Sequence, residues 1–392
     1  MVWFENGLHT HSLQLIKSPI KPVANSIFAL ISIQRSAAVM PESTHESPDN
    51  NTANNENSPI LRRKRTNNQL ILNRLPPEVL SHIFFIGTQY DRQVWRWESR
   101  NIWSQHIASH VCSHWREVAI GTSSLWTFIH ILGPPSEYTA LHITRAGDAL
   151  VDILIDMFAL VPYPNFPYDP LRSVRPTAET LRFLTTHGAG PCRWRSFLVR
   201  FPESDLLPVF ISFLNRTASI SLQLLRFECA NWMLHNQNSN NEAVLGDNTE
   251  GTRHHHDKYR TLLGSSLPAL REVELVSISA PYVYTPQPIA ALPALRTLSI
   301  APSSPYSVDL TNLLLANPQL ESLYLQGGYY YGDEPRSNRP DRDLIRPVIM
   351  PSLRSLSVNA LDNAQWVMHM LSTIKAPKLN SGKTCIVYSL WK

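Results

Sequence analysis

The nine residues LPALREVEL at positions 267–275 return almost unchanged as LPALRTLSI at positions 292–300. The same pattern, a proline and a leucine followed by two alternating apolar residues, occurs again in NPQLESLYL (317–325) and MPSLRSLSV (350–358). Alternation with a period of two is typical of a strand that buries one face. Each phrase therefore predicts a short β-strand after its leucine.

The spacing of the phrases predicts how these strands are arranged. Leu270, Leu295 and Leu320 recur every 25 residues, within the range of about 20 to 29 residues that is typical of leucine-rich repeats. Leu353 follows after 33 residues, because a loop rich in Tyr, Asp and Arg is inserted at 327–346. One such unit cannot bury its own apolar residues, so units must stack. We therefore expect residues 131–392 to form an irregular leucine-rich-repeat solenoid of the α/β class.

Strand-like alternation also occurs upstream of the phrases. Val151, Ile153, Ile155 and Met157 recur at every second position around Asp152 and Asp156, and residues 197–201 (FLVRF) show the same apolar period. These segments predict two more strands in the same domain. The number of units between residues 132 and 263 does not follow from the pattern.

Residues that alternate with the buried positions face outward, where a bound protein can contact them. Loops at 236–260 and 327–346 are expected to leave from one face and to form a rim. From the register of the phrases we expect five residues to contact a protein substrate: Glu272, Glu274, Arg296, Tyr324 and Arg354.

A helical region precedes the repeats. Pro76 and Pro77 suit the start of a helix, and Glu78 places a negative charge near its positive end. Apolar residues then recur at helical spacing up to Gly87, where this helix is predicted to end.

A second helix is predicted further along the chain. Ile107, Val111, Trp115 and Val118 fall on one face of it, and Gly121 is its predicted end. The apolar pair at 125–126 follows as an anchor.

Four segments of this region, LPPEVL (75–80), IF (83–84), VCSHWREVA (111–119) and LW (125–126), together resemble the F-box-like motif of the large F-box families of mushroom-forming fungi. Their order, spacing and residue types agree with that motif. The chain departs from the shortest F-boxes at 89–104, where an insertion carries three tryptophans. The resemblance therefore leaves the path of the middle helix open.

The resemblance implies a function as well as a fold. Residues 70–130 would form a small helical F-box-like domain that docks to the Skp-type adaptor, and through it to the cullin, of a ubiquitin ligase. The repeat domain would hold a protein substrate, in the cytoplasm, the nucleus or both. The docking contacts that the resemblance implies are Leu75, Pro76, Leu80, Ile83, Val111, Trp115 and Trp126. The same features also fit a leucine-rich-repeat scaffold that binds a partner without recruiting a ligase.

The amino-terminal 69 residues read as a poorly structured leader and linker. Residues 41–69 are rich in Asn, Ser, Glu, Thr and Pro and nearly devoid of large apolar residues, so they cannot bury enough surface to offset their ordering entropy. The basic run RRKR at 62–65 is read as solvated sequence in preference to a nuclear import signal. The apolar run at 23–33 is too short to cross a bilayer, which needs about 20 apolar residues.

Composition and motifs argue against other classes of function. A net charge of +4 over 392 residues, with Lys and Arg dispersed, does not favour nucleic acid as the partner. Four widely separated cysteines predict neither a disulfide framework nor a zinc site. No phosphate-binding loop, nucleophile elbow or metalloprotease motif occurs, and the histidines at 254–256 read as a solvated loop. We expect a protein without catalytic residues, cofactor or metal.

Overall fold

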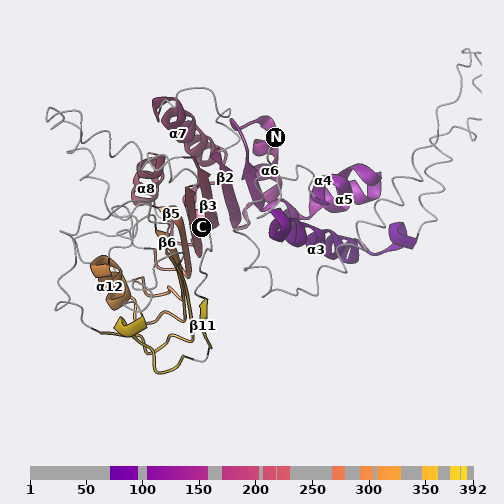
Figure 1. Ribbon diagram of the computed structural model, residues 1–392. Coiled ribbons are helices and arrows are strands. Elements are labelled where there is room, and N and C mark those ends of the chain that lie inside the picture. Colours follow the sequence, from indigo (N-terminus) through magenta and orange to yellow (C-terminus); the bar gives the residue numbers. More distant parts are fainter. Residues whose placement is uncertain are drawn as a thin grey trace, which may run out of the picture. The chain divides into compact units, whose positions relative to one another are not determined.

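A computed structural model describes part of the chain, and it divides the chain into two compact units, Met1–Trp126 and Thr127–Lys392 (Figure 1). The leader, the basic run, residues 96–103 of the tryptophan-bearing insertion, and the predicted rim loops at 236–260 and 328–346 lie outside the described residues. The residues described are 71–95, 104–157, 170–202, 206–217, 219–229, 267–278, 292–302, 307–327, 347–360, 371–379 and 381–385.

The described part of the first unit is helical. Its elements are η3 (Ile71–Arg74), α3 (Pro77–Trp95), α4 (Ser104–Val111), α5 (Ser113–Gly121) and η4 (Ser123–Trp126). Helix α3 begins where the proline pair predicts, because the carbonyl of Pro76 accepts hydrogen bonds from Val79 N at 3.0 Å and Leu80 N at 3.1 Å. None of the helices among the described residues combines the length and the apolar character needed to cross a bilayer.

The predicted end of the first helix at Gly87 is wrong, since α3 continues to Trp95. Gly87 has a packing role instead. A Cβ atom at this position would lie 2.9 Å from the Oγ of Ser104, so glycine lets the start of α4 approach α3 closely. The carboxylate of Asp91 fixes the same junction by accepting a hydrogen bond from Ser104 N at 2.7 Å.

The single second helix that the sequence predicts is also wrong, because two helices, α4 and α5, meet at Cys112. Cys112 is extended, with φ −155° and ψ 172°, and its Sγ accepts a hydrogen bond from Trp115 N at 3.5 Å. This side chain caps α5 and ends the run of helical backbone. Apolar spacing alone does not reveal such a break, because the stripe continues across it.

The core of the helical unit is built from α3, α4, α5 and η4. Leu80, Trp115 and Trp126 are buried in it. The rings of Phe84 and Trp115 lie 5.0 Å apart, and the indole N–H of Trp126 donates to the carbonyl of Ala119 at 2.8 Å. These contacts tie the segment after α5 back onto the helices.

The second unit contains a nine-stranded sheet among the described residues, in the order β1-β2-β3-β4-β5-β6-β7-β9-β11, and every described pair is parallel. A separate pair joins β8 (Val348–Ile349) to β10 (Ile374–Lys375). The strands of the large sheet are β1 (Phe128–Ile131), β2 (Val151–Asp156), β3 (Trp194–Phe201), β4 (Leu224–Cys229), β5 (Glu272–Ile278), β6 (Thr297–Pro302), β7 (Ser322–Gly327), β9 (Ser355–Ala360) and β11 (Ser381–Cys385).

The four repeated phrases supply β5, β6, β7 and β9, as predicted, and each strand follows a tight turn that the phrase itself encodes. In the first phrase Leu270 N donates to Leu267 O at 3.1 Å, and in the second Leu295 N donates to Leu292 O at 2.9 Å. Proline occupies the second position of these turns, where its fixed φ is favourable. The same bond, from Leu379 N to Ala376 O, precedes β11. Residues 376–379 (APKL) therefore form a further copy of this turn that the sequence pattern alone does not reveal.

Helices lie beside this sheet (Figure 1). The described helices of the unit are α6 (Glu137–Ala146), α7 (Pro170–Thr186), α8 (Leu207–Arg216) and α12 (Ser307–Ala316), and a short turn, η6 (Pro191–Arg193), leads into β3. Phe210 of α8 packs against Phe197, Phe201 and Phe227, with ring centroids 6.0 to 6.2 Å apart. This aromatic cluster joins β3 and β4 to α8.

The fold is therefore mixed α/β, as expected, but the sheet is not the expected solenoid. A solenoid needs one unit of nearly constant length. Here the buried position equivalent to Leu225 recurs at 273, 298, 323 and 356, and some connections contain a long helix while others contain only turns among the described residues. The repeated phrase thus produces a local strand and turn, and the chain between phrases varies too much to give one repeating layer.

Candidate functional site

The pairing register assigns each side chain of the sheet to one of two faces. One row of cross-strand neighbours is apolar and buried throughout: Ile129, Ile153, Phe197, Leu225, Val273, Leu298, Leu323 and Leu356. The adjacent row belongs to the opposite face and becomes polar from β4 onward, with Arg226, Glu274, Ser299, Tyr324 and Ser357. This polar face is the candidate binding surface of the unit.

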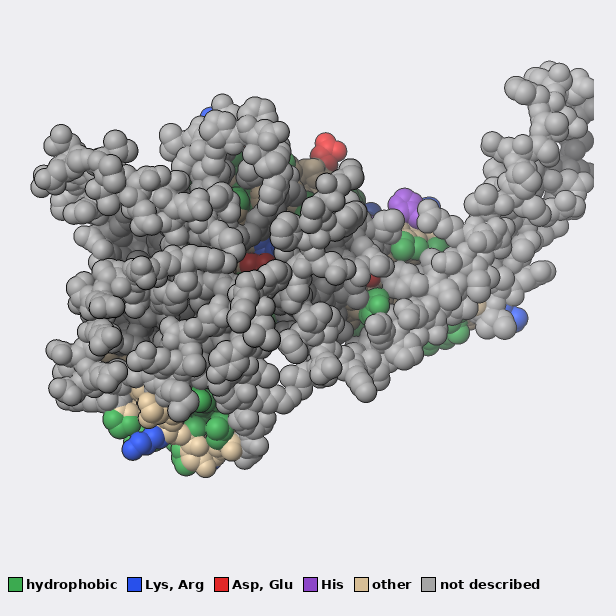
Figure 2. All heavy atoms as spheres, viewed as in Figure 1, with side chains coloured by type: hydrophobic (Ala, Val, Ile, Leu, Met, Phe, Trp, Pro, Cys, Tyr) green, Lys and Arg blue, Asp and Glu red, His purple; other side chains and the backbone are tan. Residues whose placement is uncertain are grey.

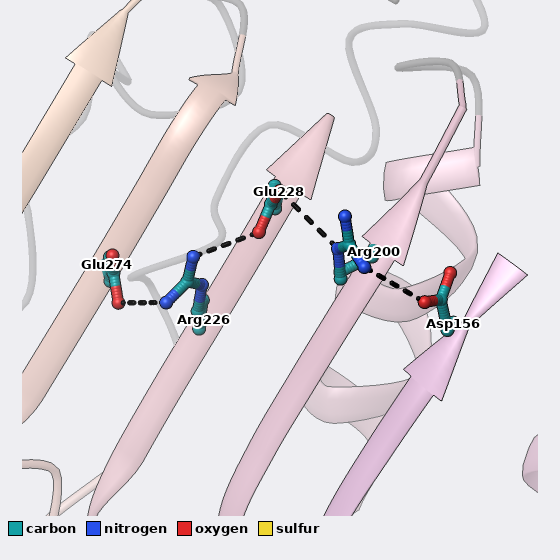
Figure 3. Close-up of polar contacts among 5 residues, drawn as sticks. All are labelled: Asp156, Arg200, Arg226, Glu228 and Glu274. Carbon is teal, nitrogen blue, oxygen red and sulfur yellow. Dashed lines mark hydrogen bonds and ion pairs between the residues drawn. The ribbon is translucent and has the colours of Figure 1, made fainter. Parts of the chain in front are cut away.

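One half of the polar face is a chain of alternating charges on β2 to β5 (Figure 3). Arg200 bonds to Asp156 at 3.0 Å and contacts Glu228 at 3.4 Å. Arg226 then joins Glu228 at 2.9 Å to Glu274 at 3.0 Å. Each arginine lies between two carboxylates, so both positive charges of this chain are paired within the sheet, and its three carboxylates leave one excess negative charge.

A separate ion pair, between Asp152 and Arg195, explains why Asp152 is buried on β2. Its carboxylate accepts a bond from Arg195 Nε at 2.9 Å and another from Ser196 Oγ at 2.8 Å, both on the neighbouring strand. The hydrogen bonds to Asp152 raise the pKa of Arg195 above its ordinary value, and partial burial opposes that rise. A buried carboxylate is tolerated here because it is paired.

The other half of the polar face, on β6, β7 and β9, is uncharged and rich in hydroxyl groups. Tyr324 lies in the middle of it with an exposed fraction of 41%. Its hydroxyl-bearing neighbours are half-buried: Thr297, Ser299, Ser322, Ser355 and Ser357. Small hydroxyl groups cost little to desolvate compared with charges, and an exposed tyrosine is a common anchor at protein interfaces.

The five predicted substrate contacts fall in different places on this unit. Glu274 belongs to the charge chain, Glu272 lies half-buried on β5, and Tyr324 lies in the hydroxyl-rich half. Arg296 and Arg354 precede β6 and β9 at the edge where those strands begin, and both are exposed. The structure thus brings Tyr324, Arg296 and Arg354 to neighbouring strands, whereas Glu274 is already engaged by Arg226.

Sequence reasoning missed one residue of this edge, Arg271, which precedes β5 and is exposed like the other two. The signal was present, because the phrase leucine is followed by arginine in three of the four phrases. Sequence reasoning also missed the charge chain, since its partners come from separate segments.

The seven predicted docking residues of the helical unit differ in exposure. Leu80, Trp115 and Trp126 are buried core residues, so in this structure they support the surface and do not present their own side chains. Pro76 is exposed, and Leu75, Ile83 and Val111 are half-buried. Docking by any of them stays a prediction.

The structure adds Val79 to the docking candidates. Its side chain is 43% exposed, and it lies one helical turn from both Pro76 and Ile83 on α3. Ile120 at the end of α5 is also exposed. Hydrophobic side chains are visible at the surface of this unit in Figure 2. Pro76, Val79 and the half-buried Ile83 thus leave an apolar stripe accessible beside a filled core.

No protein-family model matches this sequence, and no curated protein matches it either.

His130 on β1 gives the second unit a predicted sensitivity to acid. Burial, together with the positive charge of Arg200, lowers the pKa of His130 to about 3. The unfolded chain, with an ordinary histidine pKa near 6.5, therefore takes up a proton below that pH while the folded protein does not. This residue alone is expected to cost about 2 kcal/mol of folding free energy at pH 5 and nothing above pH 7.

The test compares the free energy of unfolding of the wild type and His130→Asn between pH 7.5 and pH 5. Because asparagine does not titrate, the variant should gain stability relative to wild type by about 2 kcal/mol over this range. A difference that stays constant with pH would show that His130 takes up its proton in the folded protein as well.

Proposed function

We propose that this protein is a non-catalytic adaptor of a Skp-cullin-F-box type ubiquitin ligase. The helical unit would dock to the Skp-type adaptor, and the sheet would hold a target protein, in the cytoplasm or the nucleus. The observation that carries the proposal is the accessible apolar stripe of Pro76, Val79 and Ile83, which lies within the segments that resemble the F-box motif.

The chemistry in this proposal belongs to other subunits. The chain contributes proximity, since holding a target lysine near the loaded conjugating enzyme raises its effective concentration without a catalytic side chain here. The polar face of the sheet suits this role. It is part of a parallel sheet and carries the exposed Tyr324 in its hydroxyl-rich half. The hydroxyl groups there have a lower free-energy cost of desolvation than charged groups.

The helical stripe gives the first test of this proposal. Replacing both Pro76 and Val79 with alanine removes exposed apolar surface and leaves the buried core intact. Docking energy concentrates in a few central apolar residues, so affinity for a Skp-type adaptor should fall by about 2 kcal/mol, roughly thirtyfold. The measurement is a calorimetric titration of purified full-length protein with the adaptor, with a melting curve for each variant.

The matched control is Leu141→Ala in α6, because Leu141 has the same exposed fraction of 43% but lies in the other unit. Its affinity for the adaptor should equal that of wild type. If wild type shows no binding at tens of micromolar adaptor, roughly the range that a functional complex needs, the ligase role is wrong. The protein would then be a scaffold that binds its partner without a ligase.

A further inference from the structure

The residues immediately before four neighbouring strands form a row along the end of the sheet where these strands begin. This end is called the edge below. Arg271, Arg296, Glu321 and Arg354 each occupy the position before the strand, in β5, β6, β7 and β9. Their backbones are hydrogen-bonded in series: Arg296 N to Arg271 O, Glu321 N to Arg296 O and Arg354 N to Glu321 O, each at 2.8 Å. The row is therefore set by the sheet itself.

The charges of this row are only partly neutralised. Arg296 contacts Glu321 at 3.3 Å, and both side chains are nearly half exposed. No ion pair joins Arg271 or Arg354 to any of the residues that the structure describes. Even with Glu272 counted beside Glu321, the three arginines outnumber the carboxylates. This edge contrasts with the charge chain of Figure 3, where each arginine has two carboxylate partners.

The geometry of the row defines what it can bind. Arg271 and Arg354 lie three strand steps apart, about 14 Å at the usual spacing of about 4.8 Å between strands. An extended peptide advances about 3.4 Å per residue, so side chains four residues apart span the same distance and point to the same side. Arg296 and Glu321, which pair with each other, lie between Arg271 and Arg354. A ligand with a third negative charge at this point would be repelled by the carboxylate of Glu321.

We propose that this edge binds two oxyanions carried four residues apart on an extended segment of the target protein. The segment would cross the strands where they begin, with Arg271 and Arg354 each holding one oxyanion. This inference rests on the proposed function in that the segment belongs to the target. Carboxylates and phosphate groups share this chemistry, since arginine binds either in a bidentate manner.

The test measures fluorescence anisotropy of labelled twelve-residue peptides in a Gly-Ser background, titrated with the full-length protein. One peptide carries two glutamates four residues apart, a second carries phosphoserines at those places, and a third carries glutamines. The charged peptides should bind about tenfold more tightly than the glutamine peptide, as expected for two exposed ion pairs. A preference for the second peptide over the first would identify the oxyanion as phosphate.

The variant Arg271→Ala with Arg354→Ala should abolish this tenfold preference. Its control is Arg175→Ala with Arg182→Ala, which removes the same charge from exposed positions on α7. Equal losses in the two double variants, a glutamine peptide that binds as well as the charged ones, or no binding of any peptide at about 1 mM would each overturn the proposal. An oligothymidylate that binds more tightly than the peptides, through the same two arginines, would overturn it in favour of nucleic acid. The peptide titration does not involve the Skp-type adaptor, so its outcome is independent of the docking test.

Discussion

Replacing Trp126 with alanine is expected to lower the free energy of unfolding of the helical unit by about 3 to 5 kcal/mol. The side chain is fully buried, its ring lies 5.9 Å from that of His106, and its N–H group donates to the carbonyl of Ala119 at 2.8 Å. The substitution leaves a large cavity and removes the shorter of the two hydrogen bonds that the Ala119 carbonyl accepts, the other coming from Thr122 N at 3.4 Å. Urea denaturation followed by far-ultraviolet circular dichroism measures the loss.

The control for this prediction is Ile120→Ala, an exposed apolar residue only six positions away in sequence, whose loss should cost no more than about 0.5 kcal/mol. Trp126→Phe should fall between the two, because it keeps an aromatic ring without the N–H donor. Equal effects of the substitutions at 120 and 126 would contradict the packing described here. Under the proposed function, the Trp126→Ala variant should also lose adaptor binding in proportion to its unfolded fraction, since the Trp126 side chain is buried and is not presented to a partner.

Leu295→Ala and Leu320→Ala are each expected to destabilise the second unit by about 2 to 5 kcal/mol. Both leucines are fully buried, and both close the turns that lead into β6 and β7. Truncation removes buried apolar surface and leaves a cavity at the turn. The measurement is the denaturant midpoint of each variant, followed by a probe that reports on the sheet.

Leu315 provides a matched substitution for this pair, since it lies on α12 with 52% of its surface exposed. Leu315→Ala should shift the midpoint very little, by less than about 0.5 kcal/mol in free energy. A surface-like response at Leu295 or Leu320 would mean that the register of the phrases, and with it the assignment of the two faces of the sheet, is wrong.

In the helical region, the local sequence pattern predicts where a helix starts better than where it ends. The proline pair marked the start of α3 correctly, because a proline start depends on the residues beside it. Gly87 was misread as an end since glycine is common at helix ends, whereas here it provides room for Ser104 of another helix. The break at Cys112 was missed because a cysteine cap is unusual and the apolar stripe runs on through it.

In the second unit, the repeated phrases predict local structure but not the arrangement of the whole sheet. Four strands and the turns before them were predictable, since a proline in the turn and two alternating apolar residues are complete within nine residues. The solenoid did not follow, because it needs units of nearly constant length, and the spacing of the phrases changes from 25 to 33 residues.

By itself the sequence determined where α3 begins, which strands follow the four phrases, and that one motif recurs, because each of these properties is encoded over a few neighbouring residues. The tertiary structure decided which charges meet. Asp156 pairs with Arg200, which lies 44 residues away in sequence, and Arg226 pairs with Glu274, which lies 48 residues away. Those pairs exist because parallel pairing sets strands side by side in one register, and a shift by one residue would turn the side chains to the opposite face. The same register leaves Arg271 and Arg354 at the edge of the sheet without a carboxylate partner among the described residues.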